Sequence, residues 1–317
     1  MKVCKIPLFV MSLLGFGLWP GLDVPVAHAD FTFGEPLNLQ STNPLLLNSV
    51  NLNSVNEMID CFSADGLEMY IESGDRPGYG QCDLWVCKRA APEDDWGPPE
   101  NLGPLVNGAS DDNWASISGD GLDLYFMSTR PGGYGGWDIY VTKRATRTSP
   151  WGPATNLGSK VNSSDDDCQP SVPSDGLELY FASWRAGAGD IYVAGRATAN
   201  DPWSDSSNLG PAVNGPAEDC WTCISPDGLL LFVMSNRAGG YGGYDIWMAR
   251  RAGRTAPWEP AANLGPTFNG PTWDGRPLVT PDGSALYFVT QSGGWMTAPI
   301  LPIVDFNGDG KVDATDM

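Results

Sequence analysis

Residues 117–144 read ISGDGLDLYFMSTRPGGYGGWDIYVTKR, and recognisable copies of this stretch recur along the chain at an almost fixed distance. The Asp-Gly pair inside it falls at Asp65-Gly66, Asp120-Gly121, Asp175-Gly176, Asp227-Gly228 and Asp282-Gly283, in steps of 55, 55, 52 and 55 residues. Repetition at this period is typical of architectures in which each unit packs against its neighbours. The repeat is therefore a stronger indication of the fold than any single motif.

Each copy reads as four short strands, and the second copy shows them clearly. Alternating apolar residues over 114–118 and 122–128 flank the Asp-Gly pair. Such a pair is a strong hairpin signal because the turn needs positive φ. A glycine-rich loop over 131–136 precedes a third strand over 137–143, and the phrase WGPATNLG over 151–158 gives a weaker fourth strand.

The fourth-strand phrase is displaced relative to the repeats. It returns at 96–103, 203–210 and 258–265 but does not follow the fifth copy, and a shortened version, FGEPLNL, stands at 33–39. A chain that begins with the strand its last repeat lacks can close a ring, which protects the edges that open sheets expose. We therefore predict an all-β fold over 30–299, a five-bladed β-propeller of four-stranded blades closed by an N-terminal strand. The displaced strand weighs against a sandwich or a solenoid.

The fourth copy also carries the motifs of a known repeat. They are Ser225-Pro226-Asp227-Gly228, Leu231-Phe232, Ser235-Asn236-Arg237 and Asp245-Ile246-Trp247. Over residues ~50–297 the chain resembles the TolB-type, WD40-like propeller repeats. The resemblance implies a propeller but little about activity, because that family includes scaffolds, binding modules and domains attached to enzymes.

Four copies carry an arginine after the second strand and an aspartate at the start of the third. The pairs are Arg76 and Asp83, Arg130 and Asp138, Arg185 and Asp190, and Arg237 and Asp245. In the fifth copy Gln291 replaces the arginine, and Met296 stands where the aspartate is expected. Losing both together is what a bonded pair predicts. We therefore expect a charge-assisted Arg–Asp contact in blades one to four.

Residues 1–29 read as a secretory signal, with Lys2 and Lys5 before an apolar run and a small-x-small cleavage site at 27–29. We expect a secreted or periplasmic protein, cleaved near Ala29. The apolar run is too short for a membrane span, and no later stretch approaches ~20 apolar residues. The sequence therefore predicts no membrane span.

The charge of the chain limits its chemistry and its partners. The formal net charge of −20 becomes −21 when the signal is removed, because two lysines and one aspartate leave with it, and the only histidine leaves too. Without histidine, Ser-His-Asp and Cys-His catalysis and imidazole metal ligands are excluded. An acid-rich surface repels phosphate backbones, so we expect no nucleic-acid partner; calcium, or neutral and basic partners, fit better.

Six cysteines remain in the mature chain. They are Cys61, Cys82, Cys87, Cys168, Cys220 and Cys223. An even count in an exported chain is typical of disulfides, whose pairing the sequence leaves open. Cys220 and Cys223 have the spacing of a redox or zinc half-site, but no second pair matches it. We interpret these cysteines as disulfides or buried thiols rather than redox groups.

The segment 304–317 matches a twelve-residue calcium loop. Oxygen donors occupy positions 1, 3, 5, 9 and 12, a glycine makes the turn at position 6, and a lysine backbone carbonyl stands at position 7. The ligands are Asp305, Asn307, Asp309, Lys311, Asp313 and Asp316. The alternative is a solvated acidic turn. The loop resembles the first half of a type I dockerin, which implies calcium as the bound ion and a cohesin-type partner in a polysaccharide-degrading assembly.

An acidic residue lies eight positions before each Asp-Gly aspartate. These acids are Glu57, Asp112, Asp167, Asp219 and Asp274, and the tryptophans nearby are Trp114, Trp221 and Trp273. In a propeller this position lies near the start of the innermost strand, so the side chains would converge at the mouth of the central channel. Carboxylates with indole faces suit the binding of sugar rings or of a cation. The alternative is structural: the acids cap backbone amides, and the tryptophans fill gaps between blades.

Two functions follow from these features. We expect a secreted, monomeric, non-catalytic propeller that binds a polysaccharide or protein ligand, with a calcium-binding dockerin-like segment. The alternative is a carbohydrate-active hydrolase that uses two of the channel acids. A glycosidase needs two carboxylates in different environments, whereas these acids are nearly equivalent by repeat.

Overall fold

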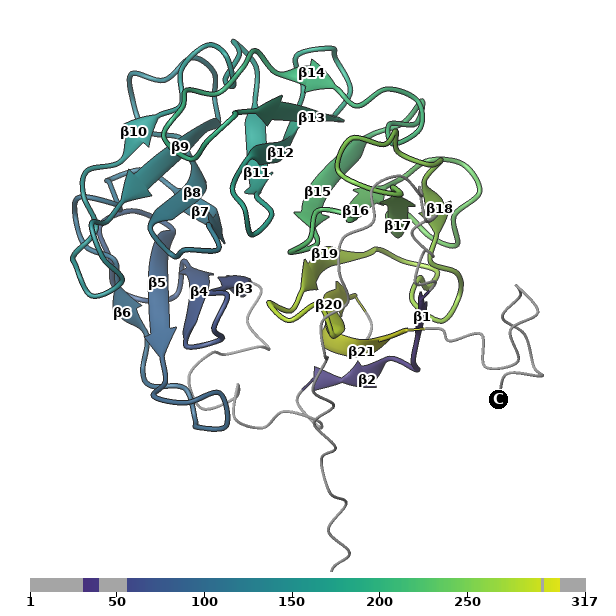
Figure 1. Cartoon of the computed structure of the whole chain (residues 1–317), viewed down its shortest axis with the longest axis horizontal. Coiled ribbons are helices and arrows are strands. Elements are labelled where there is room, and N and C mark those ends of the chain that lie inside the picture. The colour runs from purple at the N-terminus through teal and green to yellow at the C-terminus, as the bar shows by residue number, and fades with distance from the viewer. Residues whose placement is uncertain (1–30, 40–55, 292–293, 303–317) are drawn as a thin grey trace, which may run out of the picture.

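The computed structural model describes residues 31–39, 56–291 and 294–302, which form five antiparallel sheets around a common axis (Figure 1). The all-β, five-bladed prediction is confirmed. Within these residues no helix is long and apolar enough to cross a membrane. The expected signal peptide over 1–29 and the calcium loop over 304–317 lie outside the described residues.

Each blade runs outward from an inner strand beside the axis. The first blade has β3 (Glu57–Phe62), β4 (Glu68–Ser73), β5 (Asp83–Lys88) and β6 (Glu100–Asn101). The second has β7 (Asp112–Ile117), β8 (Asp123–Ser128), β9 (Asp138–Lys143) and β10 (Thr155–Asn156). The third has β11 (Asp167–Ser171), β12 (Glu178–Ser183), β13 (Asp190–Gly195) and β14 (Ser207–Asn208). The fourth has β15 (Asp219–Ile224), β16 (Leu230–Ser235), β17 (Asp245–Arg250) and β18 (Ala262–Asn263). The fifth contains β19 (Asp274–Val279), β20 (Ala285–Thr290) and β21 (Gly294–Pro302).

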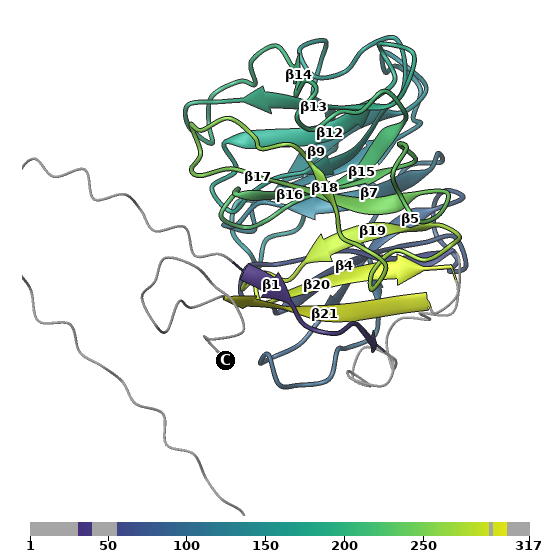
Figure 2. The same ribbon diagram turned by 90° about the vertical axis from the view of Figure 1, so that its right-hand side faces the viewer.

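The N-terminal segment completes the fifth blade. Both β1 (Phe31–Phe33) and β2 (Leu37–Asn38) pair antiparallel with β21, with Phe31 opposite Pro302 and Leu37 opposite Thr297. Figure 2 shows β1 beside β21. The predicted closure by an N-terminal strand is therefore confirmed, and it removes the open edge that the last sheet would otherwise expose.

The expected Arg–Asp contact across the second and third strands is wrong. Arg130 instead donates to Asp112 Oδ1, at the start of the inner strand, at 2.5 Å. The same exchange occurs in the other three blades: Arg76 pairs with Glu57, Arg185 with Asp167 and Arg237 with Asp219. Asp112 and Asp138 are both buried, but the oxygens of Asp138 already accept loop N–H groups, so the guanidinium compensates the charge of the inner-strand acid.

In three blades the third-strand aspartate, Asp83, Asp138 or Asp245, binds the backbone of the glycine-rich loop instead. Asp138 accepts the backbone N–H groups of Tyr134 at 2.6 Å and Gly135 at 3.1 Å. The loop approaches so closely that a Cβ on Gly133 would lie 1.7 Å from Asp138 Oδ2, which explains the glycine there.

The register also corrects the alignment of the fifth copy. Gly294 lies opposite Thr290, which is the place that Asp245 takes opposite Ser235 in the fourth blade. The residue that replaces the aspartate is therefore Gly294 and not Met296.

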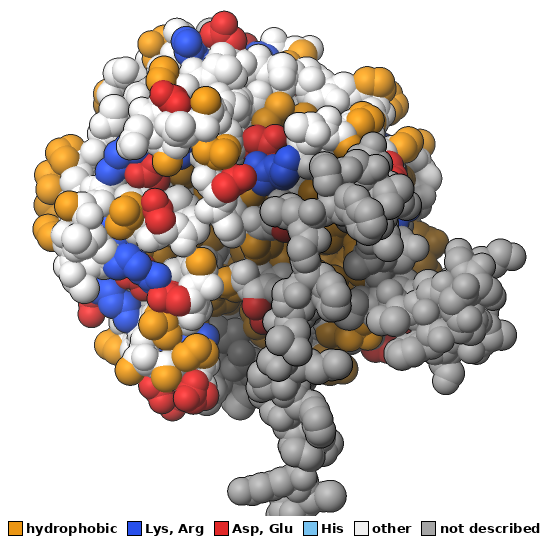
Figure 3. Space-filling model, viewed as in Figure 1, with side chains coloured by type: hydrophobic (Ala, Val, Ile, Leu, Met, Phe, Trp, Pro, Cys, Tyr) orange, Lys and Arg blue, Asp and Glu red, His pale blue; other side chains and the backbone are white. Residues whose placement is uncertain are grey.

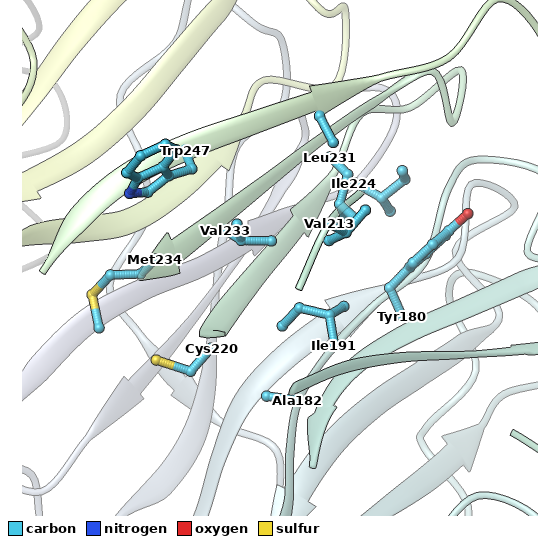
Figure 4. Close-up of a cluster of buried hydrophobic side chains, with 11 residues drawn as sticks. Tyr180, Ala182, Ile191, Val213, Cys220, Ile224, Leu231, Val233, Met234 and Trp247 are labelled. Carbon is cyan, nitrogen blue, oxygen red and sulfur yellow. The ribbon is translucent and has the colours of Figure 1, made fainter. Parts of the chain in front are cut away.

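Hydrophobic side chains fill the space between neighbouring blades. Figure 4 shows one such cluster, in which Tyr180 and Ile191 of the third blade lie near Val233 and Trp247 of the fourth. All six cysteines of the described residues are free thiols, and only Cys82 is not fully buried. This supports the buried-thiol interpretation and not the disulfide one.

Several arginines on the surface form ion pairs with carboxylates. Arg147 contacts Asp65 at 2.7 Å, and Arg254 contacts Asp175 at 3.1 Å. On the face shown in Figure 3, basic side chains lie beside acidic ones rather than in a continuous positive surface.

Candidate functional site

The acids expected at the channel mouth are the first residues of the inner strands, and all are buried. They are Glu57, Asp112, Asp167, Asp219 and Asp274, each no more than 2 % exposed. Four of them carry the arginine partners described above. Asp274 has no arginine; it accepts the Gly270 N–H at 2.5 Å, and burial, with a contribution from Asp245, raises its pKa. These side chains are bonded within their own blades and are not free to bind a ligand.

Two positions beside each acid differ from blade to blade. The position before it holds Asn56, Asp111, Asp166, Glu218 and Trp273, and the position two after it holds Ile59, Trp114, Gln169, Trp221 and Arg276. Four of these side chains line a single hollow. They are Glu218 and Trp273 at the first position, and Gln169 and Trp221 at the second. Positions shared by every repeat maintain the architecture, whereas those that vary are free to define a binding site.

This hollow, which we call the aromatic pocket, has a volume of about 460 Å³. It is lined by Gln169, Trp184, Glu218, Cys220, Trp221, Met234, Tyr244 and Trp273. Cys220 and Met234 belong to the core cluster of Figure 4, so the pocket rests on a packed base. Aromatic walls with few polar groups are typical of small-ligand sites.

Local backbone features position the indoles. Trp221 adopts φ of 51° at a β-bulge in β15, where the register with β16 shifts. Its ring meets that of Trp273 in an edge-to-face contact of 6.0 Å. Trp184 lies directly after β12 and packs beside Gly189, where an added Cβ would meet the ring at 3.0 Å. Bulges commonly re-aim side chains next to functional sites.

A carboxylate and a hydroxyl supply the polar part of the pocket. Tyr244 donates to Oε2 of Glu218 at 2.6 Å. Burial and this hydrogen bond raise the pKa of Tyr244, so the hydroxyl stays protonated. No lysine or arginine of the described residues forms an ion pair with Glu218.

An arginine, Arg276, lies against the indoles next to the pocket. The guanidinium of Arg276 lies 4.1 Å from the ring centre of Trp114 and 5.6 Å from that of Trp221. The two indoles are stacked, with centroids 5.5 Å apart. Arg276 also forms an ion pair of 2.6 Å with Glu72 of the first blade. The structure therefore brings together two of the predicted tryptophans, and it adds a cation that the sequence reading did not single out.

An acidic hollow of about 340 Å³ lies beside Glu72, the ion-pair partner of this arginine. It is lined by Asn56, Glu72, Gly74, Gln81, Cys82, Asp111 and Asn113. Asp60 lies near its wall, and burial and the carboxylate of Glu72 raise the pKa of Asp60. Across the described ranges, no group of three or more cysteine, aspartate, glutamate or histidine side chains could hold a metal ion.

The sequence reading found part of the pocket. Trp221 and Trp273 line it, and Trp114 stacks on Trp221. It missed Trp184, Glu218, Tyr244 and Arg276. The sequence does distinguish these residues, because they depart from the repeat. Trp184, for example, stands where the neighbouring blades have Thr129 and Asn236.

Comparisons with known proteins bear on the fold alone. No family model matches the sequence, and no curated protein matches it. The endo-arabinase from Bacteroides thetaiotaomicron VPI-5482 superposes with a TM-score of 0.50 at 16% identity, over 82% of this chain and 98% of that chain. The α-L-arabinofuranosidase from Lactobacillus brevis gives 0.50 at 12% identity, over 82% and 94%.

A TolB structure from Acinetobacter baumannii gives a TM-score of 0.49 at 16% identity and covers 77% of this chain. The chain spans about half the length of that TolB, 54%. At these identities the likeness establishes a β-propeller and no activity. The class that the fold defines is therefore a five-bladed β-propeller.

Proposed function

We propose that this chain is the ligand-binding propeller of an exported protein and that it holds a saccharide in the aromatic pocket without cleaving it. One observation carries the proposal: side chains that depart from the repeat, Trp184, Glu218, Tyr244 and Trp273, meet in a single hollow. Architecture alone does not require them, because the other blades are built without them.

The chemistry of the pocket suits a sugar ring. Three indoles offer flat faces for the C–H groups of a pyranose. Gln169, Glu218 and Tyr244 offer a small number of polar groups for its hydroxyls. The volume of about 460 Å³ lies within the range of roughly 300–1,000 Å³ that is usual for small-ligand sites.

A hydrolase is the second candidate, because burial and Glu72 raise the pKa of Asp60, and a raised pKa is what a general acid needs. A glycosidase needs two carboxyl groups roughly 5–9 Å apart. Asp60 interacts with its neighbours Glu72 and Arg276 rather than being set opposite a second carboxyl group across a ligand site, and among the described residues Glu218 is the only carboxylate that lines the aromatic pocket. The geometry thus favours binding over turnover.

The test uses the chain from residue 30 onward and a panel of oligosaccharides. Binding is measured by calorimetry, and the saccharide is then recovered and separated by chromatography. We expect binding with intact saccharide, and a loss of binding in Trp221→Ala. Trp137→Ala is the matched control, because Trp137 takes the place of Tyr244 in the second blade and lies outside the pocket. Turnover that is abolished by Asp60→Asn would establish the hydrolase instead.

Export and calcium belong to the same proposal and rest on the sequence. The secretory signal and the acidic loop at 305–316 fit an extracellular binding module whose partner is a cohesin-type protein. A polysaccharide ligand would suit that setting.

A further inference from the structure

We infer that the saccharide held in the aromatic pocket is an amino sugar, bound through a protonated amine. The inference rests on the proposed function and deepens it, because it names the ligand class. It comes from the surroundings of Glu218, the one carboxylate among the described residues that line the pocket.

Glu218 differs from its counterparts in the other blades. Asp111 accepts the backbone N–H of Cys82 at 3.1 Å, and Asp166 accepts that of Trp137 at 3.0 Å. These aspartates bind the start of the third strand of the preceding blade. Glu218 occupies the same position but is longer by one methylene, and the corresponding N–H, that of Gly189, donates no hydrogen bond to it in the described part of the chain.

The carboxylate of Glu218 instead reaches into the pocket. Tyr244 fixes its Oε2 at 2.6 Å, and the backbone N–H of Glu218 donates to Asn236 at 3.0 Å, which steadies the residue. No arginine or lysine of the described residues neutralises it, in contrast to the inner-strand acid Asp219 beside it. A partly enclosed carboxylate without a cation favours a positively charged ligand group.

The indoles favour the same group. An ammonium near the face of tryptophan is attracted by the ring quadrupole. This chain already uses that interaction, because the Arg276 guanidinium lies over Trp114 at 4.1 Å. A uronic acid or a phosphorylated sugar would be repelled by Glu218 and by the formal net charge of −20. A sugar bearing an amine satisfies the carboxylate, the indoles and the polar groups together.

The experiment titrates the chain from residue 30 onward with three oligosaccharides of equal length, at pH about 5.5, where an amine is protonated. They are a β-1,4-linked glucosamine hexamer, its N-acetylated counterpart and cellohexaose. We expect the glucosamine hexamer to bind about tenfold more tightly than either neutral hexamer, as one charge-assisted hydrogen bond provides. Glu218→Gln should remove this preference, so that the glucosamine hexamer binds no more tightly than the neutral hexamers do.

Glu100→Gln is the control for net charge, because Glu100 is exposed and far from the pocket in the first blade. It should keep the preference, and thermal unfolding should confirm that both variants are folded. Equal or weaker binding of the glucosamine hexamer, or a preference that survives Glu218→Gln, would overturn the inference while leaving saccharide binding intact. No binding of any hexamer would overturn the proposed function and this inference with it.

Discussion

The hydroxyl of Tyr244 lies 2.6 Å from Oε2 of Glu218, and this bond joins the residue before β17 to the residue before β15. It spans one blade at the channel mouth and holds a carboxylate among indoles. Neither residue belongs to the repeat, because the second blade has Trp137 and Asp111 at these places. This contact between two departures from the repeat lies at the centre of the saccharide site proposed above.

The geometry of the pocket should depend on a glycine. A Cβ at Gly189 would meet Trp184 at 3.0 Å and Cγ of Glu218 at 3.1 Å, so Gly189→Ala should displace both side chains. We expect about a tenfold loss of saccharide affinity, equivalent to ~1.4 kcal/mol. Gly253→Ala is the control, because nothing lies within 4 Å of a Cβ there. Calorimetry should show unchanged affinity in the control; an equal loss in both variants would point to a general effect on folding.

The inner-strand ion pair should dominate the stability of a blade. Asp112 is fully buried, and its two oxygens accept from Arg130 at 2.5 Å and from the Gly108 N–H at 2.6 Å. Asp112→Ala leaves the arginine unpaired, and breaking such a pair costs about 3–5 kcal/mol. Lys88→Met breaks an exposed pair with Glu100 and should cost less than ~1 kcal/mol. Urea unfolding compares the two, and similar losses would refute a structural role for the buried pair.

Ring closure can be tested with two neighbouring leucines. Leu39 is fully buried against the core of the closing seam, whereas Leu37 in β2 is 52% exposed. Leu39→Ala should lower the free energy of unfolding by about 2–5 kcal/mol, as for other buried leucines. Leu37→Ala should change it by less than ~0.5 kcal/mol. If thermal and urea unfolding showed equal effects, the N-terminal segment would not be packed as described.

Asp60 should make stability fall as pH rises. Burial and the neighbouring Glu72 raise the pKa of Asp60 in the folded state, while Arg276 and the Ala115 N–H oppose this. A raised folded-state pKa gives stability that is present below the unfolded pKa of about 3.9 and is lost as pH rises through the folded value. Asp60→Asn keeps the shape without the charge. It should be more stable than the unchanged protein at neutral pH, with the difference shrinking toward pH 4; a constant difference would contradict the assignment.

The acidic loop at 305–316 should bind one calcium ion. Its donors alternate as in twelve-residue calcium loops, and Asp309 supplies the fifth position. Calorimetry after removal of calcium by a chelator should show uptake in the unchanged chain and none in Asp309→Ala. Asp201→Ala, an exposed aspartate elsewhere, should retain uptake. Calcium binding that survives Asp309→Ala would place the ion at another site.

The sequence predicts the propeller well because its signals are local and repeated. An Asp-Gly pair fixes each hairpin by its own turn chemistry, and the displaced phrase at 33–39 predicts which strands pair at the closure. Which charged groups pair with each other is harder to predict from the sequence. Arg130 is eight residues from Asp138 but pairs with Asp112, eighteen residues away, because loop N–H groups already occupy the oxygens of Asp138 in the folded chain.

The pocket was harder to predict for a related reason. Spacing identified the repeated acids, which the fold uses for itself. Trp184 and Trp273 are 89 residues apart and belong to different strand connections, so only the circular arrangement of blades brings them to one hollow. The useful signal lay in the positions where one repeat differs from the others.

The central claim is that the departures from the repeat form a saccharide site, and a crystal structure of the chain soaked with the tightest-binding hexamer tests it most directly. We predict electron density for a sugar ring between Trp184 and Trp273, with a polar group of the sugar within hydrogen-bonding distance of Glu218. Density in the acidic hollow or on the opposite face, with the aromatic pocket empty at saturating ligand, would contradict the account.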